Sequence, residues 1–367
     1  MFSEFKPINK AVWLEKVKQD LKGKPLSDLA LNIGGENLYP FCHPDDLEES
    51  PVPIIAESDW EIGEDILVAQ DTNKTNRKLI AALESGVNAP RLVLQKNISY
   101  SSLAIILAGV NLEMVSLHFY FKNKNANPLA LFNHLIKLIS LKRIEMDAVN
   151  ASFNWEYEKS VSESDKIELF EKIKSTGINL KGVTINGEKY FSENKAINEL
   201  VEIIMAGEKL IDKLKSEKLS PAFINRHIQF SLPIGKNYFL QIAKIRALKL
   251  CWANILSAYQ IEGPLPDIEA HLAAKSQIED KNTNMIAATA QSMAAINGGA
   301  GRLTVLPSDY FAESTTDFSR RIARNVQHLL KMESGLDRVA DPGAGSYFIE
   351  KLTALLAKKT WEKFAAQ

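Results

Sequence analysis

Apolar and polar positions along residues 60–367 alternate between two periods. Short apolar runs, typical of buried strands, are separated by longer segments with apolar residues at helical spacing. Residues 238–253 are apolar on most of a helical circumference and contain neither Gly nor Pro, which indicates a helix buried on nearly all sides. The expected strands are residues 65–69, 91–94, 116–121, 145–151, 182–185, 228–232, 267–271 and 303–306. The expected helices are residues 73–83, 101–107, 128–139, 164–175, 195–214, 238–253, 284–296, 317–332 and 347–367.

Strands and helices that alternate about eight times predict a parallel barrel. The competing architecture, a doubly wound open sheet that binds a dinucleotide, requires a glycine-rich turn after its first strand. Here the first expected strand is followed by Gln-Asp-Thr-Asn-Lys-Thr-Asn, without glycine. We therefore expect an α/β chain with a (β/α)8 TIM barrel over residues 60–367 and a C-terminal helix on its outside.

Residues 1–59 have a different pattern. An expected helix over residues 9–21 is stopped by Gly23 and Pro25, and an irregular segment rich in Gly and Pro follows. This stretch has too few apolar residues for a core of its own. We expect an extended and helical N-terminal arm that packs on the barrel or on a partner subunit.

Composition narrows the function classes. The 367 residues carry a formal net charge of −1, so nothing in the charge balance favours nucleic acid or an anionic membrane. No apolar run is long enough to span a bilayer, and the N-terminus lacks a signal-peptide core. Cys42 and Cys251 show no metal-type spacing. We expect a cytoplasmic protein without a resident metal ion or structural disulfide.

Four stretches of the sequence resemble one enzyme family. They are residues 226–235 (RHIQFSLPIG), 238–253 (YFLQIAKIRALKLCWA), 317–330 (DFSRRIARNVQHLL) and 339–350 (VADPGAGSYFIE). Together they resemble the acyl-CoA mutases that use adenosylcobalamin, and methylmalonyl-CoA mutase most. The arm segments LEKVKQDLKGKPLSDL and LYPFCHPDDLEE resemble the small subunit of the heterodimeric members. The resemblance implies a role in the radical interconversion of methylmalonyl-CoA and succinyl-CoA, as part of propionate metabolism.

The ends of two expected strands decide between a catalytic and a non-catalytic subunit. After the fifth strand, catalytic members carry Gly-Tyr-His, whereas this chain has Gly187 followed by Glu188, Lys189 and then Tyr190. The family's histidine is missing there, and we expect Glu188 and Lys189 to be solvated loop charges. At the end of the seventh strand, His271 aligns with a family histidine that lies near substrate and cofactor. A strand-end histidine can equally bond a neighbouring group without taking part in chemistry.

Two further groups are weaker candidates. Gly298 and Gly299 precede the eighth strand and could let backbone amides approach a phosphate of a cofactor. Because they follow a helix, a helix C-cap is the simpler interpretation. Arg320, Arg321 and Arg324 could bind phosphate, but a helix exterior or a subunit contact is the simpler interpretation.

The cofactor motif of the family is absent. No Asp-x-His-x-x-Gly occurs, the motif that supplies a histidine to cobalt. We therefore expect a small, non-catalytic subunit that stabilises a larger catalytic mutase subunit in a heterodimer. Adenosylcobalamin is expected in the assembled enzyme and not on this chain alone, and the acyl-CoA substrate is expected on the partner. Two alternatives remain open: a catalytic barrel paired with a separate cobalamin-binding chain, and a stand-alone acyl-CoA-binding barrel. A roomy barrel centre would favour the last, and a filled centre a scaffold.

Overall fold

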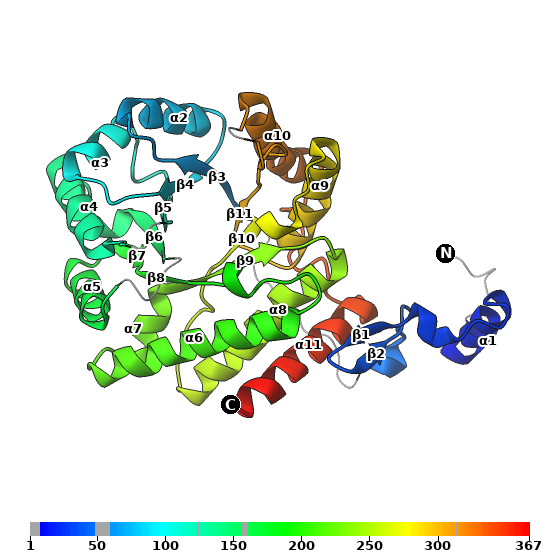
Figure 1. Ribbon diagram of the computed structural model, residues 1–367. Helices are drawn as coiled ribbons and strands as arrows, with labels where there is room; N and C mark the ends of the chain where they lie inside the picture. Colours follow the sequence, from blue (N-terminus) through cyan, green and yellow to red (C-terminus); the bar gives the residue numbers. More distant parts are fainter. Residues whose placement is uncertain (1–7, 48–58, 123–124, 156–160, 313–314) are drawn as a thin grey trace.

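A computed structural model describes residues 8–47, 59–122, 125–155, 161–312 and 315–367. A parallel sheet curls around a central axis and a ring of helices surrounds it, so the predicted (β/α)8 barrel is confirmed (Figure 1). The strands of this sheet are β3 (Glu61–Leu67), β4 (Ala89–Leu94), β5 (Leu117–Phe121), β6 (Asn150–Trp155), β7 (Asn179–Lys181), β8 (Val183–Asn186), β9 (Ile228–Ile234), β10 (Ile268–Leu272) and β11 (Arg302–Thr304). Their order is β7-β6-β5-β4-β3-β11-β10-β9-β8.

β7 and β8, which stand at the two ends of this order, together form the fifth strand of the barrel. β7 pairs in parallel with β6, and β8 pairs in parallel with β9. Between them stands Gly182, whose N–H donates to the carbonyl of His227, 2.8 Å away. The fifth strand therefore changes its pairing partner at Gly182, and the barrel closes through the continuous chain.

The helices cover the outer face of the sheet. Those of the barrel are α2 (Thr72–Glu84), α3 (Tyr100–Ile106), α4 (Pro128–Lys142), α5 (Glu163–Thr176), α6 (Ala196–Ser216), α7 (Pro221–Arg226), α8 (Tyr238–Ala258), α9 (Lys281–Asn297), α10 (Asp317–His328) and α11 (Tyr347–Ala365). Among the described residues, no helix is both long and apolar enough to cross a membrane.

The buried helix predicted from residues 238–253 is α8. It is flanked by α6 and α9 around the barrel, and α11 packs on the outside against both α6 and α8 (Figure 1). The side-chain oxygen of Asn237 caps its first turn by accepting from the N–H of Leu240. Trp252 packs edge-on against Phe230 of β9, with 4.8 Å between ring centroids. Phe239, in the first turn of α8, is exposed.

Side chains alternate along the strands with the period of two that a pleated strand imposes. The outward set is apolar and packs under the helices, as Leu117, Phe119 and Phe121 of β5 show. The inward set is polar on nearly every strand, as His118 and Glu269 show. The hydrophobic core is therefore a shell between sheet and helices, and the barrel centre is polar.

Several predicted element bounds need correction. The fourth strand was expected at residues 145–151, but β6 is Asn150–Trp155, because a 3-10 turn (Met146–Ala148) precedes it. The first strand was expected to begin at Asp65 but begins at Glu61, since acidic residues on it have buried partners. The helix expected over residues 317–332 is α10 followed by a π-helical turn at Leu329–Glu333. Two large apolar residues of this stretch, Phe318 and Leu329, are exposed.

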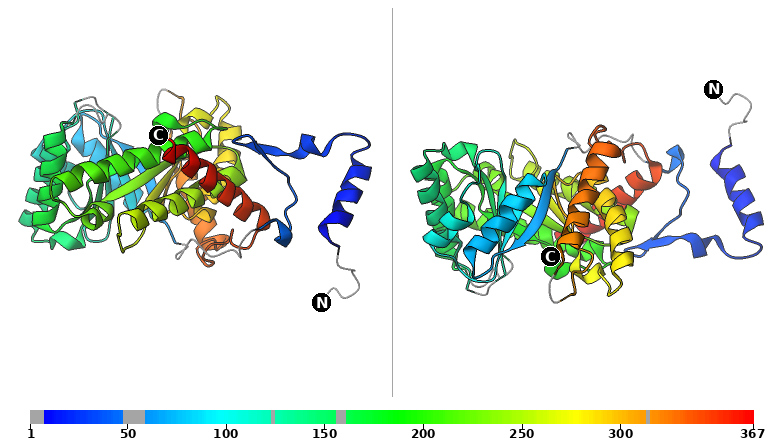
Figure 2. Two further views of the ribbon diagram at one scale, coloured as in Figure 1. Left: turned by 90° about the horizontal axis from the view of Figure 1, so that it is seen from below. Right: turned by 90° about the horizontal axis from the view of Figure 1, so that it is seen from above.

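The N-terminal arm extends away from the barrel. Its hairpin, β1 (Leu31–Ile33) and β2 (Glu36–Leu38), lies beside α11, where Lys359 faces Glu36. Beyond the hairpin, α1 (Lys10–Asp20) stands clear of the barrel in both views of Figure 2. The predicted domain boundary at residue 59 adjoins residues 48–58, which lie outside the described residues.

Candidate functional site

A network of charged and polar side chains fills the centre of the barrel. Its middle is Glu269 of β10, whose side chain is only 3% exposed. Arg91 of β4 donates from Nη1 to Glu269 Oε1 over 3.2 Å, and Arg302 of β11 donates to Glu269 Oε2. Ser231 Oγ lies 2.6 Å and Asn154 Nδ2 3.1 Å from Glu269 Oε1. Strands from opposite sides of the barrel are thus joined through one carboxylate.

The surroundings of Glu269 keep it ionised. Burial alone would raise the pKa of its carboxyl, but the charges of Arg302 and Arg91 and the Ser231 hydroxyl outweigh burial and hold the pKa well below its usual range. Arg91 also donates to both oxygens of Asp65, over 2.6 and 2.9 Å. These carboxylates raise the pKa of Arg91 further, so the network consists of fixed charges at neutral pH.

His118 of β5 is a neutral member of the network. Its Nδ1 lies 2.6 Å from Ser152 Oγ, and Arg302 Nη1 points at the same ring. Burial and the charge of Arg302 lower the pKa of His118 to about 4, although Glu61 and Glu269 act in the opposite direction. At neutral pH an uncharged imidazole therefore lies beside both Arg302 and Glu61.

His271 lies at the carboxyl end of β10, above this network. Its Nε2 is 2.8 Å from Glu188 Oε2, and its Nδ1 is 3.3 Å from Ser231 Oγ. Burial would raise the pKa of Glu188, but the hydrogen bond and charge of His271, together with Lys275 and Arg91, hold it below its usual value. Both ring nitrogens of His271 therefore have protein partners.

The structure brings Glu188 and His271 together, which the sequence analysis did not anticipate. Glu188 was expected to be a solvated loop charge, and this expectation is wrong: its side chain is 21% exposed and faces His271. Lys189 and Tyr190 follow it on the 3-10 turn Glu188–Tyr190. Lys189 is exposed, with its Nζ 4.6 Å from the Tyr190 ring centroid, while Tyr190 packs partly against the core. A role for His271, Lys189 or Tyr190 in chemistry stays a prediction.

The two glycines end a helix. Gly298 is the C-cap of α9, and its N–H donates to the carbonyl of Ala294 over 3.0 Å. A Cβ on Gly298 would lie 2.9 Å from Ile245 Cδ1, so the position requires a close approach to α8. Gly299 has φ +85°, which favours glycine. Its carbonyl accepts from Lys249 Nζ over 2.7 Å. A role for either glycine toward a cofactor stays a prediction.

Two arginines of α10 have a structural role. Arg320 and Arg324 both donate to the carboxylate of Glu64, a nearly buried residue of β3, the latter over 2.7 Å. The expectation of an outward-facing basic helix surface is therefore wrong for these two. Arg321 is exposed and lies over the Phe318 ring.

Sequence reasoning missed the residues that dominate the site, namely Arg91, His118, Glu269 and Arg302. Arg91, His118 and Glu269 each stand on a strand between two buried apolar residues, as in Ile268-Glu269-Ala270, and Arg302 begins β11 directly before Leu303. This alternation was the available signal. Cations and hydrogen-bond donors occupy both oxygens of the central carboxylate. The network is therefore suited to stabilising the barrel and not to acid-base catalysis.

The fold and the site define a class of protein: a (β/α)8 barrel whose axis is occupied by paired charges. Sequence comparison adds the family. A profile of the methylmalonyl-CoA mutase family matches residues 99–366. The chain belongs to this family.

Two small subunits match this chain over most of its length, and a large subunit matches less than half of it. The methylmalonyl-CoA mutase small subunit of Porphyromonas gingivalis is 29% identical over 99% of this chain and 63% of its own length. The small subunit of Streptomyces virginiae is 27% identical over 83% of this chain and 51% of its own length. The large subunit of Propionibacterium freudenreichii subsp. shermanii is 34% identical over 44% of this chain and 22% of its own length. The chain thus spans between half and two thirds of the small subunits that it matches.

Similarity to solved structures is lower. A dihydropteroate synthase of Xanthomonas albilineans, in complex with indole-2-carboxylic acid and 6-chloroguanine, superposes with a TM-score of 0.44. The two are 9% identical, and the match covers 75% of this chain and 94% of that one. Similarity at this level supports no inference about function.

The family's chemistry depends on cobalamin, and the residues of this chain do not fit a cobalamin site. A protein ligand to cobalt needs a histidine with a free ring nitrogen. Of the six histidines, His271 stands at the carboxyl ends of the strands, and both of its ring nitrogens contact protein groups. Within the described part of the chain, His271 therefore offers no free ring nitrogen to a cobalt ion at this end of the barrel.

Proposed function

We propose that this chain is the non-catalytic small subunit of an adenosylcobalamin-dependent methylmalonyl-CoA mutase. It stabilises a larger catalytic subunit, which holds the cofactor and interconverts methylmalonyl-CoA and succinyl-CoA. In such enzymes the cofactor supplies the radical chemistry, and the protein positions and shields it. The proposal thus includes adenosylcobalamin as the cofactor, methylmalonyl-CoA as the substrate and a catalytic subunit as the partner.

The observation that carries the proposal is the filled barrel centre. An acyl-CoA that entered the axis would have to separate Glu269 from Arg91 and Arg302. Each buried charge that loses its partner costs several kcal/mol. The thioester is uncharged, and a carboxylate on the acyl group, as in methylmalonyl-CoA, could pair with the arginines only by leaving Glu269 without a partner. This argues against the stand-alone acyl-CoA-binding barrel and favours a scaffold.

The arm supports a partner subunit. α1 has no buried residue, although its Trp13 stacks on Phe41 with 4.1 Å between ring centroids. Ile8, Val12 and Tyr39 are exposed on the same arm. An isolated arm that leaves large apolar side chains in water gains stability when a second chain covers them. We infer that the arm contacts the catalytic subunit.

Co-expression with a large mutase subunit from the source organism tests the proposal. The two chains should co-purify as a heterodimer, and the mutase activity should need the large subunit. Deletion of residues 1–55 should weaken the assembly, whereas exchanging the exposed Arg321 of α10 for Ala should leave partner affinity unchanged. Mutase turnover by this chain with a separate cobalamin-binding protein, and without a large subunit, would contradict the proposal. Unchanged affinity after arm deletion would contradict the role of the arm.

A further inference from the structure

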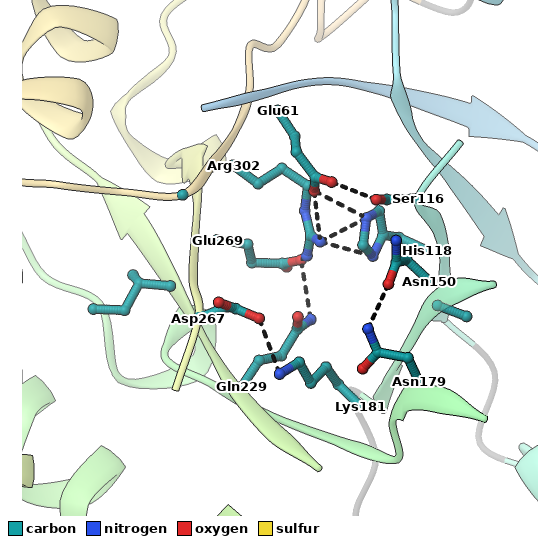
Figure 3. A pocket seen from close by; sticks show the side chains of 13 residues that line it. Glu61, Ser116, His118, Asn150, Asn179, Lys181, Gln229, Asp267, Glu269 and Arg302 are labelled. Atoms are coloured by element: carbon teal, nitrogen blue, oxygen red, sulfur yellow. Dashed lines mark hydrogen bonds and ion pairs between the residues drawn. The ribbon is translucent and has the colours of Figure 1, made fainter. Parts of the chain in front are cut away.

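A pocket opens at the amino-terminal ends of the strands, at the far end of the barrel from His271. It has a volume of about 250 Å³. Figure 3 shows its polar walls: Glu61, Ser116 and His118 lie on one side near Arg302, and Lys181 and Asp267 lie on the opposite side. Neither His271 nor the turn with Glu188 lines it. The arguments for a scaffold therefore leave this pocket unexplained.

The ionised side chains of the pocket do not balance. Its lining carries three carboxylates, from Glu61, Asp267 and Glu269, and two cations, from Lys181 and Arg302, so the sum is 2 − 3 = −1. His118 adds no charge at neutral pH, because burial and Arg302 lower its pKa to about 4. The pocket is thus anionic even though the whole chain is nearly neutral.

The unbalanced charge belongs to Glu61. Lys181 pairs with Asp267 over 3.0 Å, and Arg302 pairs with Glu269. Glu61 reaches Arg302 only at 3.9 Å and otherwise accepts from the Ser116 hydroxyl. Burial would raise the pKa of Glu61, but His118, Arg302 and Ser116 hold it below its usual range, so the carboxylate is ionised. Its nearest cation, Arg302, is shared with Glu269, and the His118 ring, at 3.7 Å, is uncharged.

Besides its carboxylates, the pocket keeps two amide carbonyl oxygens as acceptors, while the amide nitrogen of Asn150 adds a donor. The amide nitrogen of Gln229 donates to Thr184 Oγ1 over 2.8 Å, and that of Asn179 donates to Asn150 Oδ1. Each of these amides therefore keeps its carbonyl oxygen for a ligand. The unpaired Nε of Arg302 is covered by protein. A ligand rich in N–H donors matches this lining.

The volume of the pocket and the types of its lining residues narrow the class of ligand further. At about 30 Å³ per water molecule, the volume holds roughly eight waters or a ligand of about ten non-hydrogen atoms. Among the described residues, no group of three or more His, Cys, Asp or Glu is placed to hold a metal ion. An organic cation satisfies both the charge and the acceptors, because an ammonium or guanidinium group carries several donors on one positive charge.

We propose that the amino-terminal pocket binds a small organic cation, an ammonium or guanidinium compound, with Glu61 as its counter-ion. The ligand bridges β3 and β9, which stand on different sides of the barrel, and therefore stabilises the closed fold in proportion to its concentration. The binding is independent of mutase activity and of the partner subunit.

Titration calorimetry and thermal unfolding of the full chain with agmatine and putrescine test the proposal. Both cations should bind and raise the Tm, whereas 1,4-butanediol and succinate, which match putrescine in length, should do neither. Glu61→Gln should weaken agmatine binding at least tenfold, and Glu113→Gln, at an exposed position before β5, should leave it unchanged. Asp267→Asn, at the exposed rim, should also weaken binding and serves if Glu61→Gln unfolds.

Three results would overturn the proposal. The first is no binding of either cation at about 10 mM, well above the weakest constant expected for a built site. The second is equal binding of 1,4-butanediol, because the charge would then play no part. The third is agmatine binding that survives both Glu61→Gln and Asp267→Asn.

Discussion

Arg91 on β4 and Glu269 on β10 meet across the barrel axis, 178 residues apart in sequence, with 3.2 Å between Nη1 and Oε1. The pair works as a crosspiece that holds two sides of the barrel together. Because both groups are buried, its value depends on every partner being present.

Removing the central charge should therefore destabilise the fold strongly. Glu269→Gln leaves Arg302 and Arg91 with one carboxylate fewer in a buried site. We expect the free energy of unfolding to fall by about 3–5 kcal/mol, the usual cost of breaking a buried ion pair. Urea unfolding followed by circular dichroism measures it. Glu279→Gln, at an exposed position, is the control and should change stability by less than about 0.5 kcal/mol. A similarly small change for Glu269→Gln would show that the network adds nothing.

His118 should make stability depend on pH. Its pKa is lowered to about 4 in the folded chain from an ordinary value of 6.5, so between these values the unfolded chain binds the extra proton. Stability from this group is complete above pH 6.5 and is lost as the pH falls toward 4, by about 2 kcal/mol between pH 7.5 and 5. Comparing urea unfolding of the wild type and His118→Gln at both pH values isolates the contribution. Equal pH slopes in the two proteins would disprove it.

The pair of Lys244 on α8 and Glu199 on α6 should behave as a unit. Lys244 Nζ lies 2.9 Å from Glu199 Oε1 and 2.6 Å from the carbonyl of Pro233, and both side chains are fully buried. Lys244→Met should cost about 3–5 kcal/mol, because Glu199 then lacks its cation. The double variant Lys244→Met, Glu199→Leu should recover most of this loss, as measured in a double-mutant cycle. Additive effects would show that the two residues are not coupled.

The proposed scaffold role predicts that His271 and Lys189 are dispensable for turnover. In the assembled enzyme, His271→Ala and Lys189→Ala should each leave kcat within about twofold of the wild type. A general acid or base, or a positioning group, would instead cost about 100-fold or more. His271 also bonds Glu188, so the assay needs enzyme shown to be a full heterodimer with unchanged melting. A 100-fold loss under those conditions would make this chain a catalytic participant.

The isolated chain should not bind adenosylcobalamin tightly. Both ring nitrogens of His271 are occupied, and the barrel axis is filled by the Glu269 network. Equilibrium dialysis of the purified chain, with the assembled heterodimer as the positive control, measures this directly. A dissociation constant of about 1 µM or tighter for the chain alone would refute the prediction.

The outer face of the barrel could be predicted from sequence because hydrophobic burial governs it. The outward residues of each strand form apolar patterns, and they located eight strand positions and most helices. The inner face is governed by pairing between charged side chains of different strands, which the composition of the chain does not reveal. Asp65 and Arg91 look like surface residues, yet each is placed inside by its partner on another strand. Such pairings depend on the closed sheet, so no window of sequence contains them.

The same limit applies to the candidate site. His271 could be singled out from its place at the end of a strand, but its partner Glu188 lies 83 residues away and had been interpreted as solvated. Likewise, the arginines of α10 could be interpreted only after Glu64 was located beneath them. In both cases the sequence identified one residue of the pair but could not show which residue it contacts.

The change of pairing at Gly182 divides the barrel into two parts, one of five strands and one of four. On one side stand β3 to β7, and on the other β8 to β11, and the hydrogen-bonded register between the parts is the short β3–β11 ladder. A chain cut at residue 182 would sever the covalent closure and leave each fragment with its own strands and covering helices. Such fragments are natural candidates for complementation. In the intact protein, hydrogen exchange should show that the β3–β11 ladder opens first.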